Sequence, residues 1–274
     1  MKRILAFLAL VAFSALPAAG QGVLSADVDG DSISIRISVL GLGADLNLAF
    51  EEVTGLSLAN LGVSAQLVNP FSPSLRARLP SGSGVIAVPL LIRIEPPASG
   101  SLSFTGVATI DFHTNLVHYL PGTPLRLFSA PAGGPFEDIT MAMGSGSYRA
   151  RANKGGFSEF LIVADLRPVN QVIGTKFNRL EQLLDQYEDD MPGSVYDDLE
   201  ESLEDARAAF DGGSTSGAIE EINEFLDLVE QHSGTEIPDV WRAARDVTNV
   251  AGYLRGAATT LRFSLKLKSG SGLF

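Results

Sequence analysis

The chain has 274 residues, of which 45% are hydrophobic and none is cysteine, and its formal net charge is −12. That apolar content is enough for one or two ordinary hydrophobic cores without disulfide bonds. The acidic balance argues against nucleic acid as a partner, because neutralising phosphates requires basic patches.

The first 20 residues have the pattern of a cleavable export signal. The charged pair at 2–3 precedes an apolar stretch over 4–13, and small residues occupy 18–20. Pro17 ends the apolar stretch before it is long enough to span a bilayer. We therefore expect cleavage after Gly20 and a mature chain that does not span a membrane. Export without any cysteine is typical of bacteria, which predicts a periplasmic or secreted location.

Residues 21–168 predict an antiparallel β-sandwich of the immunoglobulin-like class. The pair Asp29-Gly30, between strands at Val23–Val28 and Asp31–Val39, suits a type I′ hairpin turn, because Asp-Gly tolerates positive φ. In the second strand isoleucines alternate with polar residues, as in a half-buried strand. Many short strands without helical periods between them are typical of two packed sheets. The further strands expected are Leu46–Phe50, Val63–Leu67, Gly84–Ile94, Leu102–Phe112, Leu116–Leu120, Leu125–Phe128, Ile139–Met143, Ser147–Ala152 and Phe157–Ala164.

One segment, 107–120, carries a candidate metal site. If Thr114-Asn115 is a two-residue turn, Asp111 lies opposite His118, and His113 shares their face. Two histidines and a carboxylate could hold a divalent transition metal, which gives the alternative hypothesis of a metal-dependent hydrolase or oxidase. Polar side chains also belong on the solvent face of a sheet, so both interpretations stay open.

Two other motifs do not reach the pattern that their chemistry needs. The acids Asp27, Asp29 and Asp31 are a weak calcium candidate, because Gly30 stands fourth where a helix-loop calcium site has glycine sixth. We interpret them as part of the hairpin turn. The run GSGSY over 144–148 has glycine where a nucleophile elbow has serine, so a Ser-His-Asp triad has no motif to support it.

From residue 169 the apolar period becomes helical and predicts a bundle over 169–256. Amphipathic stripes cover 172–187, 196–210, 219–229 and 241–254. Pro192-Gly193 ends the first helix, Ser194 caps the second, Ser214 or Ser216 caps the third, and Pro238 begins the fourth.

The predicted helices are strongly acidic. Residues 177–240 contain 19 aspartates and glutamates against two arginines, mostly off the apolar stripes. The simplest interpretation is a solvated acidic face. A surface for cationic partners or loosely held calcium is the alternative.

The end of the chain predicts a return to β-structure. Leu261, Phe263, Leu265 and Leu267 alternate with polar residues, so we expect a strand over 257–268 and a flexible tail over 269–274. Because a lone strand is unstable in water, it should pair with an edge of the sandwich.

Residues 199–256 resemble the FIMAH helical module of secreted and surface-attached bacterial proteins. The matching positions are Ala218, Ile219, Ile222, Phe225, Leu226, Val229, Gly234 and Ile237. The resemblance implies a non-catalytic accessory module and carries no site residues.

The sequence therefore favours an exported bacterial protein that is not an enzyme and that binds, adheres or plays a structural role at the cell envelope. Its partner would be a protein, a glycan or another envelope component, and no cofactor is predicted. Besides the metal-dependent enzyme, a carrier of an apolar ligand between the sheets is a third hypothesis.

Overall fold

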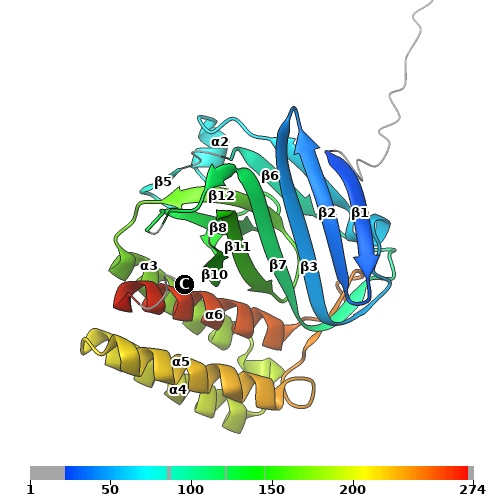
Figure 1. Ribbon diagram of the computed structural model, residues 1–274. Helices are drawn as coiled ribbons and strands as arrows, with labels where there is room; N and C mark the ends of the chain where they lie inside the picture. The colour runs from blue at the N-terminus through cyan, green and yellow to red at the C-terminus, as the bar shows by residue number, and fades with distance from the viewer. Residues whose placement is uncertain (1–21, 85–87, 121, 145, 271–274) are drawn as a thin grey trace, which may run out of the picture.

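A computed structural model describes residues 22–84, 88–120, 122–144 and 146–270 (Figure 1). The predicted signal peptide and the last four residues of the expected tail lie outside these residues. Within them the chain forms two antiparallel sheets and six α-helices, so the predicted α+β class is confirmed.

The larger sheet contains the predicted N-terminal hairpin. Gly30 has a φ of 54° in the turn between its first two strands, as the Asp-Gly pair predicts. The sheet has the order β1 (Val23–Asp29), β2 (Ser32–Val39), β3 (Leu42–Thr54), β7 (Ser103–His118), β11 (Ser147–Lys154) and β10 (Ala142–Gly144), and β13 (Val240–Arg242) pairs with one end of β7.

The second sheet is organised around the strand predicted over Phe157–Ala164. In β12 (Glu159–Asp165) the first six residues are buried, because it lies between neighbours and both of its faces are covered. The order is β4 (Val63–Leu67), β6 (Leu90–Ile94), β12, β8 (Leu125–Ala130) and β9 (Glu137–Asp138), and β5 (Ser83–Gly84) pairs with β12.

Three hydrophobic cores hold the molecule together. Side chains from both sheets form the largest core, which includes Ile35, Phe112 and Ile162. A smaller core covers the other face of the second sheet, under the short helix α2 (Pro73–Arg76). A further short helix, α1 (Leu58–Leu61), leads into β4.

The third core belongs to four long helices, α3 (Val169–Gln186), α4 (Gly193–Asp211), α5 (Thr215–His232) and α6 (Val250–Ser269). In Figure 1, α3 and α6 lie next to the sheets, and α4 and α5 form the outer layer. The first three helices were predicted. Ser214 caps α5 by accepting a hydrogen bond from the backbone N–H of Gly217, whereas α4 begins after Pro192 instead of Ser194.

The predicted fourth helix begins in the wrong place. Residues 240–242 form β13, and Trp241 stacks on Phe104 with ring centroids 5.3 Å apart. Packing among aromatic rings thus outweighs the helical period of this segment. The helix starts after Asn249, whose side-chain oxygen accepts the N–H of Gly252 at 2.7 Å.

The predicted C-terminal strand is wrong, because residues 257–268 belong to α6. Leu254, Ala258, Leu261 and Leu265 follow the helical spacing and enter the core shared with the other helices. Phe263, on another side, lies beneath the guanidinium of Arg126 from β8, 5.9 Å from the ring centroid. A helix that is covered on more than one side carries apolar residues on several of its sides and not in one stripe. In α6, over 261–267, these residues fall at every second position, as they would in a strand.

The predicted turn at Thr114-Asn115 is also wrong. β7 continues unbroken through both residues, with β3 on one side and β11 on the other. The Thr114 side chain is buried and donates to the carbonyl of Gly43 at 2.8 Å, which fixes the extended chain. The expected strand Ile139–Met143 is likewise replaced by the short strands β9 and β10.

Candidate functional site

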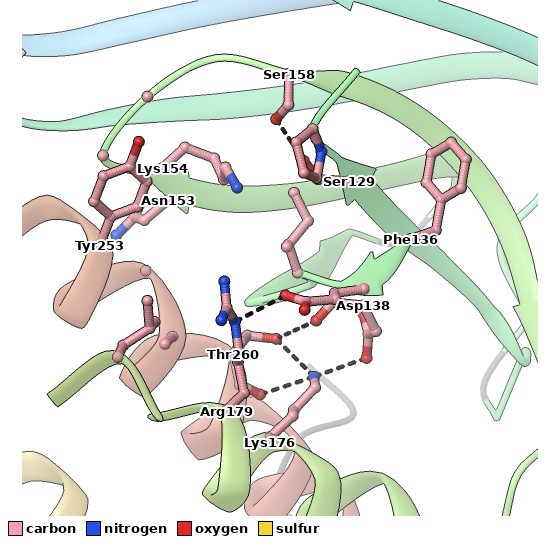
Figure 2. A pocket seen from close by; sticks show the side chains of 18 of the residues that line it. Ser129, Phe136, Asp138, Asn153, Lys154, Ser158, Lys176, Arg179, Tyr253 and Thr260 are labelled. Carbon is pink, nitrogen blue, oxygen red and sulfur yellow. Dashed lines mark hydrogen bonds and ion pairs between the residues drawn. The ribbon is translucent and has the colours of Figure 1, made fainter. Parts of the chain in front are cut away.

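A cavity of about 570 Å³ lies where the sheets meet the inner helices (Figure 2). Its walls come from the β8–β9 segment, the connection from β11 to β12, α3 and α6.

Two glycines let one wall lie against α6. A Cβ on Gly155 would lie 2.6 Å from the backbone nitrogen of Tyr253, which is closer than real Cβ contacts. Gly156 has the Tyr253 hydroxyl and the Trp241 ring close to its own Cβ position. The sequence Lys154-Gly155-Gly156 therefore brings bare backbone against the first turn of the helix and leaves Lys154 at the edge of the cavity.

A buried ion pair forms the floor of the cavity. Lys176 Nζ lies 2.7 Å from Asp138 Oδ2 and donates to Thr260 Oγ1 at 2.6 Å and to Ser264 Oγ at 2.9 Å. Burial disfavours the charged carboxylate, but the ammonium of Lys176 outweighs it and lowers the pKa of Asp138. The pair joins α3, β9 and α6, as Figure 2 shows.

The arginines that line the cavity, Arg167 and Arg179, also have carboxylate partners. Arg179 Nε lies 3.2 Å from Glu137 Oε2, and Arg167 lies 2.7 Å from Asp165. Their charges are thus largely compensated within the protein.

Lys154 differs from these cations. Its ammonium points into the cavity and makes no hydrogen bond or ion pair with any of the residues that the structure describes (Figure 2). Burial lowers the pKa of Lys154 to about 8, although the charge of Glu137 opposes this change. Lys154 is therefore a cavity cation without a direct hydrogen-bond or ion-pair partner among the described residues.

The remaining lining is largely apolar. Phe136, Ile139, Phe157 and Val172 contribute side chains to the walls, and Tyr187 and Tyr253 stack with ring centroids 6.1 Å apart. An apolar pocket with a few convergent polar groups is the usual form of a small-molecule site.

The sequence-predicted metal residues lie elsewhere, on the larger sheet. Asp111 accepts a hydrogen bond from Arg151 at 2.7 Å, and His113 lies between Asp45 and Ser147. Because β7 does not turn, His118 lies five residues beyond His113 on the same strand and is not opposite Asp111. In the described part of the chain no three His, Cys, Asp or Glu side chains gather as metal ligands would.

The cavity residues themselves were not predicted. Lys176 left a signal, because it stands among Val172, Ile173, Phe177 and Leu180 on the apolar side of its helix. A lysine at a core position is rarely buried without a partner. Asp138 and Lys154 left none, since only the tertiary fold brings them to this cavity.

A family model described as a family of unknown function, DUF6689, matches residues 7–268. The chain belongs to this family. The DUF6689 match runs from before β1 almost to the end of α6, so it includes both sheets, the four long helices and every wall of the cavity. No curated protein matches the sequence. No helix in the described part of the DUF6689 chain is both long enough and apolar enough to cross a membrane.

Proposed function

We propose that this chain is an exported bacterial binding protein, and that its cavity holds a small anionic molecule with an apolar part without reacting with it. The observation that carries the proposal is the ammonium of Lys154, which enters a largely apolar cavity and has no direct partner among the described residues. An anion there would gain a charge-assisted hydrogen bond, whereas the neighbouring cations are already paired.

The size and chemistry of the cavity support a ligand of modest size. A volume of about 570 Å³ lies within the range of small-molecule sites. Phe136 and Phe157 offer apolar contact area, and Lys154 would orient the anionic end. The ligand would thus carry a carboxylate, sulfonate or phosphate on an apolar or aromatic body.

Anilinonaphthalene sulfonate combines these features and serves as the probe. We expect it to bind the native protein, and we expect Lys154→Met to weaken binding about tenfold or more, as loss of a hydrogen bond to a charged group does. The affinity of the wild-type protein should fall as the pH rises above about 8, because Lys154 loses its charge. Fluorescence titration at several pH values measures both effects.

The matched control is Lys268→Met, which removes a lysine at the far end of α6 that bonds Asn170. It should leave probe affinity and its pH profile unchanged. Equal affinities for the wild-type protein and Lys154→Met would contradict the proposal.

The proposal includes export. We expect the chain to reach the periplasm or the medium with Gln21 as its first residue, because the peptidase cleaves after small residues. Intact-mass measurement of the exported protein tests this, and Leu8→Arg, which interrupts the apolar stretch, should retain the full-length chain in the cytoplasm. An exported chain that still carries residues 1–20 would contradict the cleavage.

Finer features of the architecture belong to the same proposal. They are the immunoglobulin-like class of the paired sheets and a FIMAH-like accessory role, with an acidic outer face, for the helices. A metal-dependent enzyme is not favoured, because Arg149 and Arg151 both pair with Asp111.

A further inference from the structure

Three polar side chains on the outer face of the larger sheet form a chain of hydrogen bonds. Asp45 of β3, His113 of β7 and Ser147 of β11 stand on three adjacent strands. His113 Nδ1 lies 3.3 Å from Asp45 Oδ2, and His113 Nε2 lies 2.5 Å from Ser147 Oγ. The histidine thus joins a carboxylate to a hydroxyl through its two ring nitrogens.

The sheet itself explains how these side chains meet. Asp45 and His113 are direct cross-strand partners in an antiparallel register. The register of β11 against β7 shifts between Ser147 and Tyr148, so Ser147 aligns with His118 instead of Asn115. Irregularities of this kind re-aim side chains and occur often beside active sites. Here the shift leaves the Ser147 hydroxyl on the His113 ring.

The hydrogen-bond partners indicate which ring nitrogen of His113 carries the proton. A carboxylate only accepts, so Asp45 takes the Nδ1–H of His113 and leaves Nε2 as an acceptor. The Ser147 hydroxyl then donates to Nε2. A nucleophile bonded to a base that a third group orients is the arrangement of an activated serine.

The surroundings suit a reaction with a dissolved substrate. The side chain of His113 is 18% exposed and Ser147 is half-buried, so both can be reached from solvent. Arg149 stands directly opposite His113 in register and is 44% exposed. Its guanidinium also lies 3.4 Å from Asp111, and it would help to neutralise an anion that develops next to Ser147.

We propose that Ser147 is an activated nucleophile that accepts acyl groups from small esters, with His113 as its general base and Asp45 as a positioning residue. Ser147 Oγ forms a bond to the ester carbonyl carbon while its proton passes to His113 Nε2. The carbon–oxygen bond to the alcohol then breaks, and His113 returns the proton to the leaving oxygen. In the second half, His113 Nε2 takes a proton from water while the water oxygen bonds to the acyl carbon. The bond from that carbon to Ser147 Oγ then breaks, and His113 returns the proton to Ser147 Oγ as the acid leaves.

This site is separate from the cavity. Seven strand positions separate Ser147 from Lys154 along β11, which is about 23 Å of extended chain. The acyl-transfer inference therefore goes beyond the proposed binding function, and either can fail without the other.

A fluorophosphonate probe tests the site, since it bonds to an activated serine and releases fluoride. We expect one label per chain, located at Ser147 by peptide mass spectrometry and absent from Ser147→Ala. His113→Gln should slow labelling and the hydrolysis of p-nitrophenyl acetate by about 10²-fold or more, because glutamine cannot act as the base. Asp45→Asn should slow both less and leave the KM for the ester unchanged.

The matched control is Ser34→Ala, which removes an exposed serine of β2 that faces the same side without a histidine contact. It should change neither rate. A second reagent removes dependence on esters: Ser147→Cys should react rapidly with iodoacetamide at neutral pH, and His113→Gln in that background should abolish the advantage. Labelling that persists in Ser147→Ala, or rates unaffected by His113→Gln, would overturn the proposal.

Discussion

Replacing Lys176 by methionine is expected to lower the free energy of unfolding by about 3–5 kcal/mol, the usual cost of breaking a buried ion pair. The ammonium is the partner of the Asp138 carboxylate, and methionine would leave that carboxylate charged and without its counter-ion among α3, β9 and α6. The hydroxyls of Thr260 and Ser264 would lose their donor as well. Urea denaturation followed by circular dichroism measures the change.

Arg179→Met is a close control for this variant. Arg179 lies about one helical turn further along α3 and pairs with Glu137, the neighbour of Asp138. Both side chains of this pair are more than 40% exposed. Its loss should cost less than about 1 kcal/mol. Adding Asp138→Asn to Lys176→Met should recover part of the stability, because no unpaired charge remains. Equal losses in the two single variants would show that the buried pair has no special role.

The ion pair between Lys176 and Asp138 also predicts how the stability of the protein changes at acid pH. Folding lowers the pKa of Asp138 from its ordinary value of 3.8, so its stabilisation is complete above that value and is lost as the pH falls through the lower, folded value.

Substituting alanine for Gly155 is expected to destabilise the protein by about 1–3 kcal/mol, as overpacking does. The new Cβ would lie 2.6 Å from the backbone nitrogen of Tyr253 and 2.7 Å from the carbonyl carbon of Gly252. These are backbone atoms in the first turn of α6. The steric clash can therefore be relieved only if the helix moves away from the sheet. Thermal denaturation compared with the wild-type protein measures the loss.

Gly174→Ala is the opposite case and the control. A Cβ at Gly174, inside α3, meets nothing within 4 Å. Alanine there should raise stability by about 0.5–1 kcal/mol, because glycine is the more costly residue in a helix. A Gly155→Ala protein as stable as the wild type would mean that α6 is not held against this glycine.

Alternation and helical period predicted the fold where an element has one buried face. The isoleucines at 33, 35 and 37 identified β2, and the stripe through Phe177 and Leu180 identified α3. The method failed for α6, where Phe263 is covered by the sheet side and Leu261 by the helices. It failed again at Thr114, whose turn propensity is overridden by pairing with Tyr148 of β11 and by a side-chain hydrogen bond to Gly43 of β3.

The sites were harder to predict than the elements. The sequence placed Asp111 and His113 on one face, which is correct. The partners of His113 are Asp45 and Ser147, however, and Ser147 lies in a segment without a nucleophile motif. Asp45, Ser147 and Lys154 acquire their meaning from cross-strand register and from the approach of α6, and neither leaves a local pattern.

The position of α6 links the cavity to the sheets and to the helical core. This helix supplies Thr260 to the cavity floor, lies against Gly155, and contributes Leu254, Leu261 and Leu265 to the helical core. A polypeptide that ends before Val250 would consequently lack one wall of the cavity and one of the two helices that lie against the sheets.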